Sequence, residues 1–308
     1  MKKIVITEFM DQAAVDSLSP DFEVIYDPSL ADKTDELIEL LKNADAIIVR
    51  NRTQVRGDLL AAAEKLAVVG RLGVGMDNID QDACRSRDIT VFPATGANDI
   101  AVAEYVITSA LMLLRRAYLS TDKMIAGQWP RTELMGNEIG GKTLGLIGFG
   151  AIARETGRMA RAIEMEVVGY DPFVPSDNPA WKAVRPLELD ELLATSDVIS
   201  LHVPLTPDTK HLINGSSIAR MKEGAIIINA ARGGVVDETA LIEGMKSGKI
   251  GGAAIDVHEI EPLNAEAGKR FEGLSNLILT PHIGGVTAES NVRVSAVTAE
   301  NVRKALEA

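Results

Sequence analysis

The feature that most constrains the fold is an alternation of short runs rich in Ile and Val with longer polar stretches of helical composition. A first series of such runs lies at residues 3–7, 22–26, 45–49, 67–70 and 89–92. Stretches with helical composition, such as residues 34–43, separate them. This alternation predicts parallel β-strands joined by crossover helices.

A second series of runs follows at residues 143–148, 166–170, 197–201, 225–229, 252–256 and 276–280. These runs are β-branched and nearly all apolar, which is typical of strands that helices cover on both faces. Apolar positions recur at helical spacing over residues 98–118, and residues 287–307 predict a further helix. The 308 residues therefore predict an α/β protein with two doubly wound parallel-sheet domains, linked by a long helix.

The charge balance excludes several classes of partner. The formal net charge is -12 and no basic patch is present, so neither nucleic acid nor an anionic lipid surface is expected to bind. The most lipid-like stretch, residues 105–114, is shorter than a membrane span. The chain begins as a strand rather than as a signal peptide, and its one cysteine is Cys84, so we expect a cytoplasmic protein.

A glycine-rich turn indicates a cofactor site. Gly148, Gly150 and Ala153 form the pattern G-x-G-x-x-A between an apolar run and a helical stretch at residues 154–163. The first glycine permits a tight turn, the second lets the backbone approach a pyrophosphate, and the alanine lets helix and strand pack closely. The helix N-terminus offers free N–H groups to the phosphates, which predicts dinucleotide binding.

Asp171 indicates which dinucleotide binds. It ends the next predicted strand, about 20 residues beyond the glycines, where an acid can hydrogen-bond the 2′-hydroxyl of the adenosine ribose. A 2′-phosphate would meet this carboxylate as a like charge, and no arginine directly follows. The position favours NAD over NADP, and a strand-capping aspartate is the alternative interpretation.

Three consecutive predicted strands of the second series each lead into a loop with a polar residue suited to catalysis. Arg232, Glu261 and His282 occupy these loops in chain order. The carboxyl ends of parallel strands lie at one edge of a sheet, and loops at that edge line cofactor crevices. Each residue alone has an ordinary structural explanation, but their joint occurrence indicates a dehydrogenase site in which His282 carries a proton.

At this point the sequence resembles the D-isomer-specific 2-hydroxyacid dehydrogenases, especially the phosphoglycerate dehydrogenase branch. The resemblance covers nearly the whole chain. It is carried by GRLGVGMDNID at residues 70–80, by residues 98–104, by GKTLG at 141–145, by LHVPLT at 201–206, by residues 229–237 and by PHIGG at 281–285.

The resemblance implies a particular domain organisation. A Rossmann NAD-binding domain at residues 98–283 is expected to be inserted into a flavodoxin-like substrate domain, made of residues 1–97 and 284–308. The active site is expected in the cleft between the domains. A homodimer is implied, with the helix that begins near Asn98 contributing to its interface. The chain resembles a short form of the phosphoglycerate branch, without the regulatory domain of its longer members, so feedback inhibition through such a domain is not expected.

The resemblance also implies roles for the three polar residues. Arg232 is expected to hold the substrate carboxylate and C2 oxygen. His282 is expected to exchange a proton with that oxygen while a hydride passes between C2 and nicotinamide, and Glu261 to hydrogen-bond and orient His282. No metal ion is expected, because no set of His and carboxylate residues has ligand spacing and the mechanism needs no Lewis acid.

Further contacts follow from the same resemblance. Asp256 is expected near the nicotinamide carboxamide, and Gly73, Val74 and Gly75 are expected to turn backbone N–H groups toward the substrate carboxylate. The other expected cofactor contacts are Ala151, Ile152, Val203, Pro204, Thr209, Ala230, Ala231, Gly284 and Gly285.

The three remaining histidines are assigned less directly. His202 matches a cofactor-lining loop in the family, and a purely structural histidine is the open alternative. His211 and His258 are interpreted as structural.

Arg52 bears on the identity of the acid. It follows the third predicted strand together with Arg50, and the phosphoglycerate branch has an arginine that matches it. If Arg52 points into the site, a phosphate, sulfonate or carboxylate at C3 is favoured, and a surface salt bridge is the alternative. Phosphoglycerate, sulfolactate, glycerate with hydroxypyruvate, and lactate-like acids all stay open.

Two other functions remain as alternatives. Phosphite oxidation uses the same fold, whereas the formate enzymes that resemble this family have a glutamine where Glu261 stands. A non-catalytic NAD-sensing interaction protein is suggested by the corepressor relatives of the family. Turnover of a 2-hydroxy or 2-keto acid would separate a dehydrogenase from the sensor.

Overall fold

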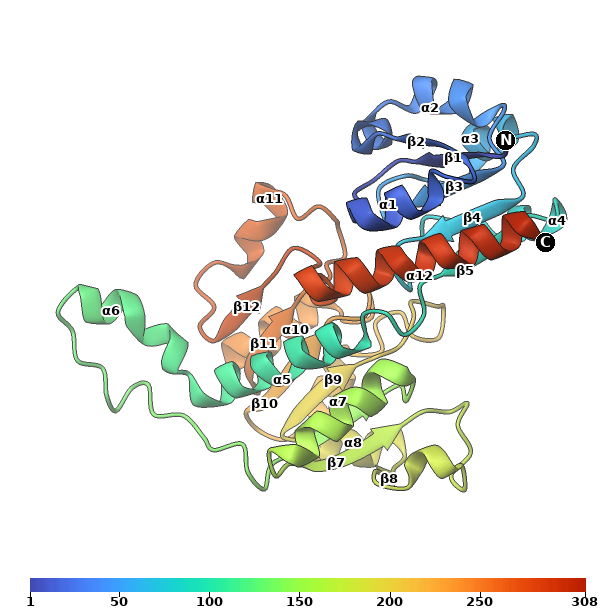
Figure 1. Cartoon of the computed structure of the whole chain (residues 1–308). Helices are drawn as coiled ribbons and strands as arrows, with labels where there is room; N and C mark the ends of the chain where they lie inside the picture. The colour runs from blue at the N-terminus through green and yellow to red at the C-terminus, as the bar shows by residue number, and fades with distance from the viewer. The chain divides into compact units, whose positions relative to one another are not determined.

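The computed structural model describes residues 1–308 and divides into two units (Figure 1). The first unit contains residues 1–98 and 286–308, and the second contains residues 99–285. These divisions lie within two residues of the expected domain boundaries. Which unit binds the substrate stays a prediction.

The first unit is built on a five-stranded parallel sheet with the order β2-β1-β3-β4-β5. This is the flavodoxin-like order that the resemblance implied. The strands are β1 (Lys3–Ile6), β2 (Glu23–Tyr26), β3 (Ala46–Val49), β4 (Val68–Arg71) and β5 (Thr90–Pro93). The helices are α1 (Gln12–Leu18), α2 (Thr34–Leu41), α3 (Gly57–Ala62), α4 (Gln81–Ser86) and α12 (Ala288–Glu307), with a 3-10 helix η1 (Pro28–Asp32).

The second unit is built on a seven-stranded parallel sheet with the order β12-β11-β10-β9-β6-β7-β8. The chain starts in the middle, runs to one edge and then crosses back, as in a Rossmann sheet. The strands are β6 (Thr143–Ile147), β7 (Glu166–Tyr170), β8 (Arg185–Pro186), β9 (Val198–Leu201), β10 (Ala225–Asn229), β11 (Ile250–Ile255) and β12 (Leu277–Leu279).

The helices of the second unit include the predicted long helix, α5 (Asp99–Arg115), which packs against α7 (Ala151–Ala162). The others are α6 (Thr121–Ile125), α8 (Leu189–Thr195), α9 (Gly215–Arg220), α10 (Glu238–Ser247) and α11 (Ala265–Gly268), with 3-10 helices η2 (Ala117–Ser120), η3 (Pro179–Trp181) and η4 (Lys269–Phe271).

Both sheets are covered on both faces, because each unit has two apolar cores. In the second unit, α5 and α7 contribute to one core, and α8, α9 and α10 contribute to the other. The apolar runs of the sequence are therefore strands with no solvent-facing side, as expected of parallel sheets. The prediction of two doubly wound α/β domains is confirmed.

A few element boundaries were predicted wrongly. The long helix ends at Arg115 rather than at residue 118, because Arg116 adopts a left-handed conformation with φ 55° and a 3-10 turn follows. β11 begins at Ile250 rather than at residue 252, and its pairing with β10 shifts register at the start. β8 was not predicted, since two residues leave no periodicity to detect.

The segment between α5 and β6 extends away from the seven-stranded sheet (Figure 1). It contains α6 and a stretch without helix or strand, residues 126–142. Its apolar side chains are unusually exposed, at 81% for Ile125, 78% for Trp129 and 75% for Met135. No helix of the structure combines the length and the apolar character needed to cross a bilayer.

Candidate functional site

Three neighbouring strands of the second unit deliver the candidate catalytic residues. β10, β11 and β12 are parallel neighbours, so their carboxyl ends lie at the same edge of the sheet. Arg232 follows β10, Glu261 follows β11 and His282 follows β12. The structure therefore places the three predicted loops at one edge.

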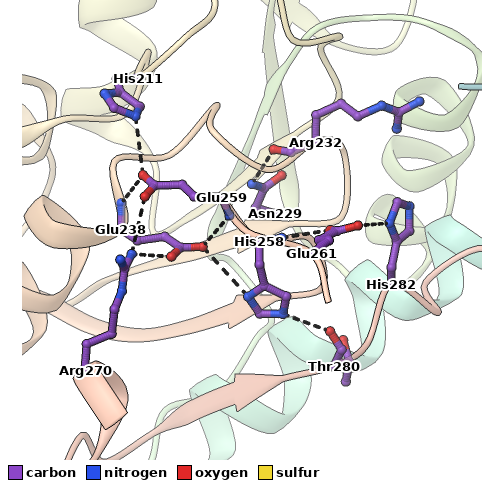
Figure 2. Close-up of polar contacts among 10 residues, drawn as sticks. All are labelled: His211, Asn229, Arg232, Glu238, His258, Glu259, Glu261, Arg270, Thr280 and His282. Carbon is purple, nitrogen blue, oxygen red and sulfur yellow. Dashed lines mark hydrogen bonds and ion pairs between the residues drawn. The ribbon is translucent and has the colours of Figure 1, made fainter. Parts of the chain in front are cut away.

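Glu261 and His282 form a direct pair (Figure 2). Nδ1 of His282 lies 2.8 Å from Oε2 of Glu261, and the other carboxylate oxygen of Glu261 accepts the backbone N–H of His258 at 2.9 Å. Burial raises the pKa of Glu261, but the hydrogen bonds from His282 and His258 outweigh it, so the net pKa is lowered. An ionised carboxylate only accepts hydrogen bonds, so Nδ1 carries the proton and Nε2 is the nitrogen available to a ligand.

The loop that carries His282 is fixed by Asp256. His282 has φ 58°, and its backbone N–H donates to the carbonyl oxygen of Asp256 at 2.8 Å. The Asp256 carboxylate accepts the N–H groups of Ile283 and Gly284, each at 2.8 Å, and the hydroxyl of Thr280 at 2.7 Å. Asp256 is only 1% exposed. It organises the histidine loop, and its contact with a nicotinamide carboxamide stays a prediction.

The loop that carries Arg232 is fixed by Asn229, a residue that the sequence did not single out. The Asn229 amide donates to the carbonyl oxygen of Arg232 at 3.0 Å and accepts the N–H of Ala231 at 3.1 Å. The loop also packs against the histidine loop, because a Cβ atom on Gly284 would lie 3.4 Å from the Cβ of Ala230. In Figure 2 the side chains of Arg232 and His282 lie on the same side of the view. The arginine and histidine loops are thus in contact.

The glycine turn has the geometry that a dinucleotide requires. Gly148 has φ 88°, and a Cβ atom there would lie 2.5 Å from the carbonyl oxygen of His202. Gly150 precedes α7, and a Cβ atom there would meet nothing within 4 Å. Ala153 is fully buried against the sheet. The turn thus leaves open space at Gly150 and the N-terminus of α7, which begins with Ala151 and Ile152, and these residues fit a pyrophosphate.

Two neighbouring segments complete this region. Asp171 directly follows β7, and its carboxylate accepts the N–H groups of Phe149, in the glycine turn, at 2.8 Å and of Phe173 at 2.9 Å. Beyond β9, Thr209 accepts the N–H of Thr206 at 2.7 Å and donates to the carbonyl oxygen of Pro204 at 2.6 Å. Asp171, the residue predicted to bind the ribose hydroxyl, is therefore held beside the glycine turn.

His202 packs under the glycine turn. Its Nε2 lies 3.0 Å from the hydroxyl of Ser200, and the Cβ position of Gly148 is bounded by its carbonyl oxygen and by Val203. Burial lowers the pKa of His202 to about 4, so its ring is neutral near pH 7. A neutral ring offers no charge to a phosphate, and this favours the structural interpretation of its side chain.

The loops of the first unit hold the expected substrate glycines and arginines. Gly73 has φ 142°, and the guanidinium of Arg71 lies against it, where a Cβ atom would stand. Arg71 stands in the GRLGVGMDNID stretch at residues 70–80, but no role was predicted for it from the sequence. Arg52 is half exposed and forms an ion pair with Asp32, which is the surface contact considered as its alternative role. Its binding of substrate stays a prediction, as do the roles of Val74 and Gly75.

Glu8 organises the loop that carries Arg52, a role that was not predicted from the sequence. Its buried carboxylate accepts the backbone N–H groups of Arg50, Asn51, Arg52 and Thr53 at 2.8 to 3.2 Å. The structure contains no group of three or more His, Cys, Asp or Glu side chains arranged to hold a metal ion.

The sequence and the structure of this chain are similar to those of known proteins. Residues 107–284 match the family model described as D-isomer specific 2-hydroxyacid dehydrogenase, NAD binding domain. The chain is 52% identical over 307 residues to an (S)-sulfolactate dehydrogenase of Chromohalobacter salexigens, covering 99% of each protein. It is 40% identical to a D-3-phosphoglycerate dehydrogenase of Methanocaldococcus jannaschii, covering 99% of this chain and 58% of that protein. The structure is similar to the TT0316 protein from Thermus thermophilus, with a TM-score of 0.87, 32% identity and coverage of 99% of this chain and 97% of that one.

Proposed function

This chain belongs to the D-isomer specific 2-hydroxyacid dehydrogenase family, and from that premise we propose that it transfers a hydride between NAD(H) and a small 2-hydroxy or 2-keto acid. We propose that Arg232, Glu261 and His282 carry the chemistry. The protein is a 2-hydroxyacid dehydrogenase that uses a nicotinamide cofactor. The single observation that carries the residue assignment is the 2.8 Å contact between Nδ1 of His282 and Glu261, which leaves Nε2 of His282 for the substrate.

The proposed chemistry follows from this pair. When bound, nicotinamide accepts or supplies the hydride at C2 of the acid. His282 takes the proton of the C2 hydroxyl on Nε2 during oxidation and returns it to the C2 oxygen during reduction. Glu261 holds the ring in the orientation that presents Nε2 and stabilises the charge that the ring gains. Arg232 binds the substrate carboxylate through its planar fork of N–H donors.

NAD is proposed over NADP because of Asp171. Its carboxylate lies beside the glycine turn, bound to the backbone of Phe149, where a ribose hydroxyl can donate to it. A 2′-phosphate at the same place would face a like charge without an adjacent arginine. The backbone at Gly148, Gly150, Ala151 and Ile152 would hold the pyrophosphate.

The remaining cofactor contacts are proposed from their places beside this turn and at the same edge of the sheet. They are the backbone of His202, together with Val203, Pro204, Thr209, Ala230, Ala231, Asp256, Gly284 and Gly285.

The proposed substrate carries a second anionic group at C3, and sulfolactate is the first candidate. The relative at 52% identity is named a sulfolactate dehydrogenase, and that at 40% a phosphoglycerate dehydrogenase. Arg52 and Arg71 are the cations proposed to meet that group, and Gly73, Val74 and Gly75 the backbone donors for the carboxylate.

A homodimer in the cytoplasm is the proposed form of the protein. A monomer rarely exposes several large apolar side chains in one segment, as residues 117–142 do with Ile125, Trp129 and Met135. A second copy of the chain that packs on this segment and on α5 would cover them.

Turnover of purified protein tests the proposal. We expect NAD reduction with sulfolactate, 3-phosphoglycerate or glycerate, and NADH oxidation with the corresponding keto acids. His282→Ala should abolish turnover while NADH fluorescence titration shows unchanged binding. His211→Asn is the matched control, because that side chain is 40% exposed and contacts none of the three proposed catalytic residues.

Two results would contradict the proposal. NADH binding without turnover of any acid in the panel would favour a cofactor-sensing protein. Turnover of phosphite but of no 2-hydroxy acid would replace the substrate class while keeping the fold.

A further inference from the structure

His258 is a buried residue that the proposed chemistry does not use. It follows β11 and stands three residues before Glu261, and it is 6% exposed. A histidine that filled space alone would need only apolar neighbours. His258 instead makes polar or close contacts with the loops of all three proposed catalytic residues.

The backbone of His258 reaches two of these loops. Its N–H donates to Oε1 of Glu261 at 2.9 Å, while the opposite oxygen of that carboxylate binds His282. Its carbonyl oxygen lies against Gly233, where a Cβ atom would stand only 1.8 Å away. Gly233 directly follows Arg232, so the arginine loop rests on the backbone of His258.

The imidazole of His258 reaches the third loop (Figure 2). Its Nε2 lies 3.1 Å from the carbonyl oxygen of Thr280, two residues before His282. A carbonyl oxygen only accepts, so Nε2 of His258 carries the proton. The ring thereby connects, through a hydrogen bond, the turn that bears Glu261 and the strand end that leads to His282.

The other side of the ring faces a buried ionic group. Nδ1 of His258 lies 3.8 Å from Oε1 of Glu238 and has no hydrogen-bond partner. Glu238 is 3% exposed and pairs with Arg270. Glu238 and Glu259 also exchange hydrogen bonds, N–H of each to a carboxylate oxygen of the other, at 3.2 and 3.0 Å. His258 is therefore held between the start of α10 and the end of β12.

We propose that His258 is a positioning residue whose ring contact with the carbonyl oxygen of Thr280 sets the geometry of the Glu261–His282 pair and of the Arg232 loop. Its backbone contacts with Glu261 and Gly233 link these loops whichever side chain stands at this position. The proposal rests on the proposed function of the three proposed catalytic residues. It assigns His258 no contact with substrate or cofactor.

Two substitutions separate positioning from filling of space. His258→Phe keeps an aromatic side chain of similar size but removes the donor to Thr280, whose carbonyl oxygen then loses its partner from the ring. His258→Gln keeps an N–H donor at a comparable distance from the backbone. A displacement of reacting groups by about 1 Å can cost about 100-fold in rate.

Steady-state kinetics give the first readout. We expect His258→Phe to lower kcat by about 10- to 100-fold, with KM and the NADH dissociation constant changed by less than about threefold. His258→Gln should recover most of kcat. His211→Asn, which alters the exposed end of the same ionic group at Glu259, should keep wild-type kcat.

The second readout does not depend on turnover. The 15N chemical shifts of the His282 ring nitrogens report which nitrogen carries the proton when the ring is neutral. In wild type and in His258→Gln, Glu261 should keep the proton on Nδ1. In His258→Phe, a mixture with the Nε2-protonated form should appear. His282→Gln assigns the signals.

The outcomes distinguish this proposal from the proposed function. Equal kcat and equal His282 shifts in wild type and His258→Phe would overturn the positioning role. Equal losses in the Phe and Gln variants, matched by equal losses of thermal stability, would also overturn it. A dependence of the His282 shifts on His258, in a protein that turns over no acid, would support the positioning role while the proposed reaction fails.

Discussion

The Asp171 carboxylate uses one oxygen for the N–H of Phe149 and the other for the N–H of Phe173. Its charge is the feature that would repel a 2′-phosphate. We expect Asp171→Asn to raise the affinity for NADPH relative to NADH by about tenfold or more, because like charges in contact cost several kcal/mol. Fluorescence titration with both reduced cofactors measures this ratio.

Asp177→Asn is the control for that substitution, because Asp177 is an exposed acid six residues further along. It removes the same charge from the surface and should leave the ratio unchanged. An unchanged ratio in Asp171→Asn as well would mean that the carboxylate does not face the ribose.

Glu8 makes the stability of the first unit depend on pH. Burial raises its pKa, but the N–H groups of Thr53, Arg50, Arg52 and Asn51 outweigh burial, so the net pKa is lowered. A carboxyl whose pKa is lower in the folded state stabilises the fold above its unfolded pKa, about 4.3, and this contribution is lost as the pH falls through the folded value.

We therefore expect Glu8→Gln to reduce the free energy of unfolding at pH 7 by about 1–3 kcal/mol, since buried N–H groups lose a charged acceptor. Below pH 4 the difference from wild type should shrink. Urea unfolding at pH 7, 5 and 3.5 measures it. A difference that stays constant with pH would show that the charge of Glu8 is not the cause.

Single residues differ in how far the sequence reveals them. Arg232, Glu261 and His282 were predicted because each stands in a short loop directly after an apolar run, and a parallel sheet brings such loops to one edge. Asn229 and Glu8 were not predicted. Their function is to hold the backbone of a loop, and that depends on contacts which no local pattern encodes.

At the level of elements, the turn between β6 and α7 contains two glycines with different requirements. Gly148 has φ 88° and no room for a Cβ atom, whereas the Cβ position of Gly150 is open. We expect Gly148→Ala to lower the free energy of unfolding by about 1–3 kcal/mol, because the new side chain strains the backbone and its Cβ atom clashes with the carbonyl oxygen of His202. Differential scanning calorimetry measures this loss.

Gly150→Ala should instead leave Tm unchanged and weaken NADH binding by about tenfold or more, which corresponds to about 1.4 kcal/mol. The two variants serve as controls for each other, because one changes stability and the other changes affinity. Full NADH affinity in Gly150→Ala would mean that the pyrophosphate does not approach this backbone.

Helices and strands were predictable where a run of residues had both the composition and the length that are typical of the element. The runs at 143–148, 166–170 and 225–229 contain enough β-branched residues to define strands, and the seven-stranded sheet of the second unit followed from such runs. The start of β11 was misplaced because Gly251, which separates Ile250 from the predicted run at 252–256, carries no strand signal. The end of α5 was misplaced because Arg116 adopts a left-handed conformation, which an arginine in the sequence does not predict.

For the whole molecule, the exposed apolar segment between α5 and β6 predicts self-association. Light scattering after size exclusion should give twice the chain mass of 33.0 kDa. The double substitution Ile125→Asp and Trp129→Asp should shift the mass to that of one chain, because it places charges where apolar surface would be buried.

Phe173→Asp is the control for the dimer, because Phe173 is 89% exposed and lies outside that segment. It should leave the mass unchanged. A wild-type protein of single-chain mass at micromolar concentration would contradict the dimer.

The first unit is assembled from both ends of the chain, since α12 packs on the sheet formed by residues 3–93. During synthesis the ribosome delivers every residue of the second unit before it delivers α12. The second unit can therefore complete its fold while translation continues, whereas the first must keep one apolar face of its sheet without this helix until α12 itself emerges. During that interval the nascent protein exposes the apolar face of this sheet, and we expect chaperones to bind there.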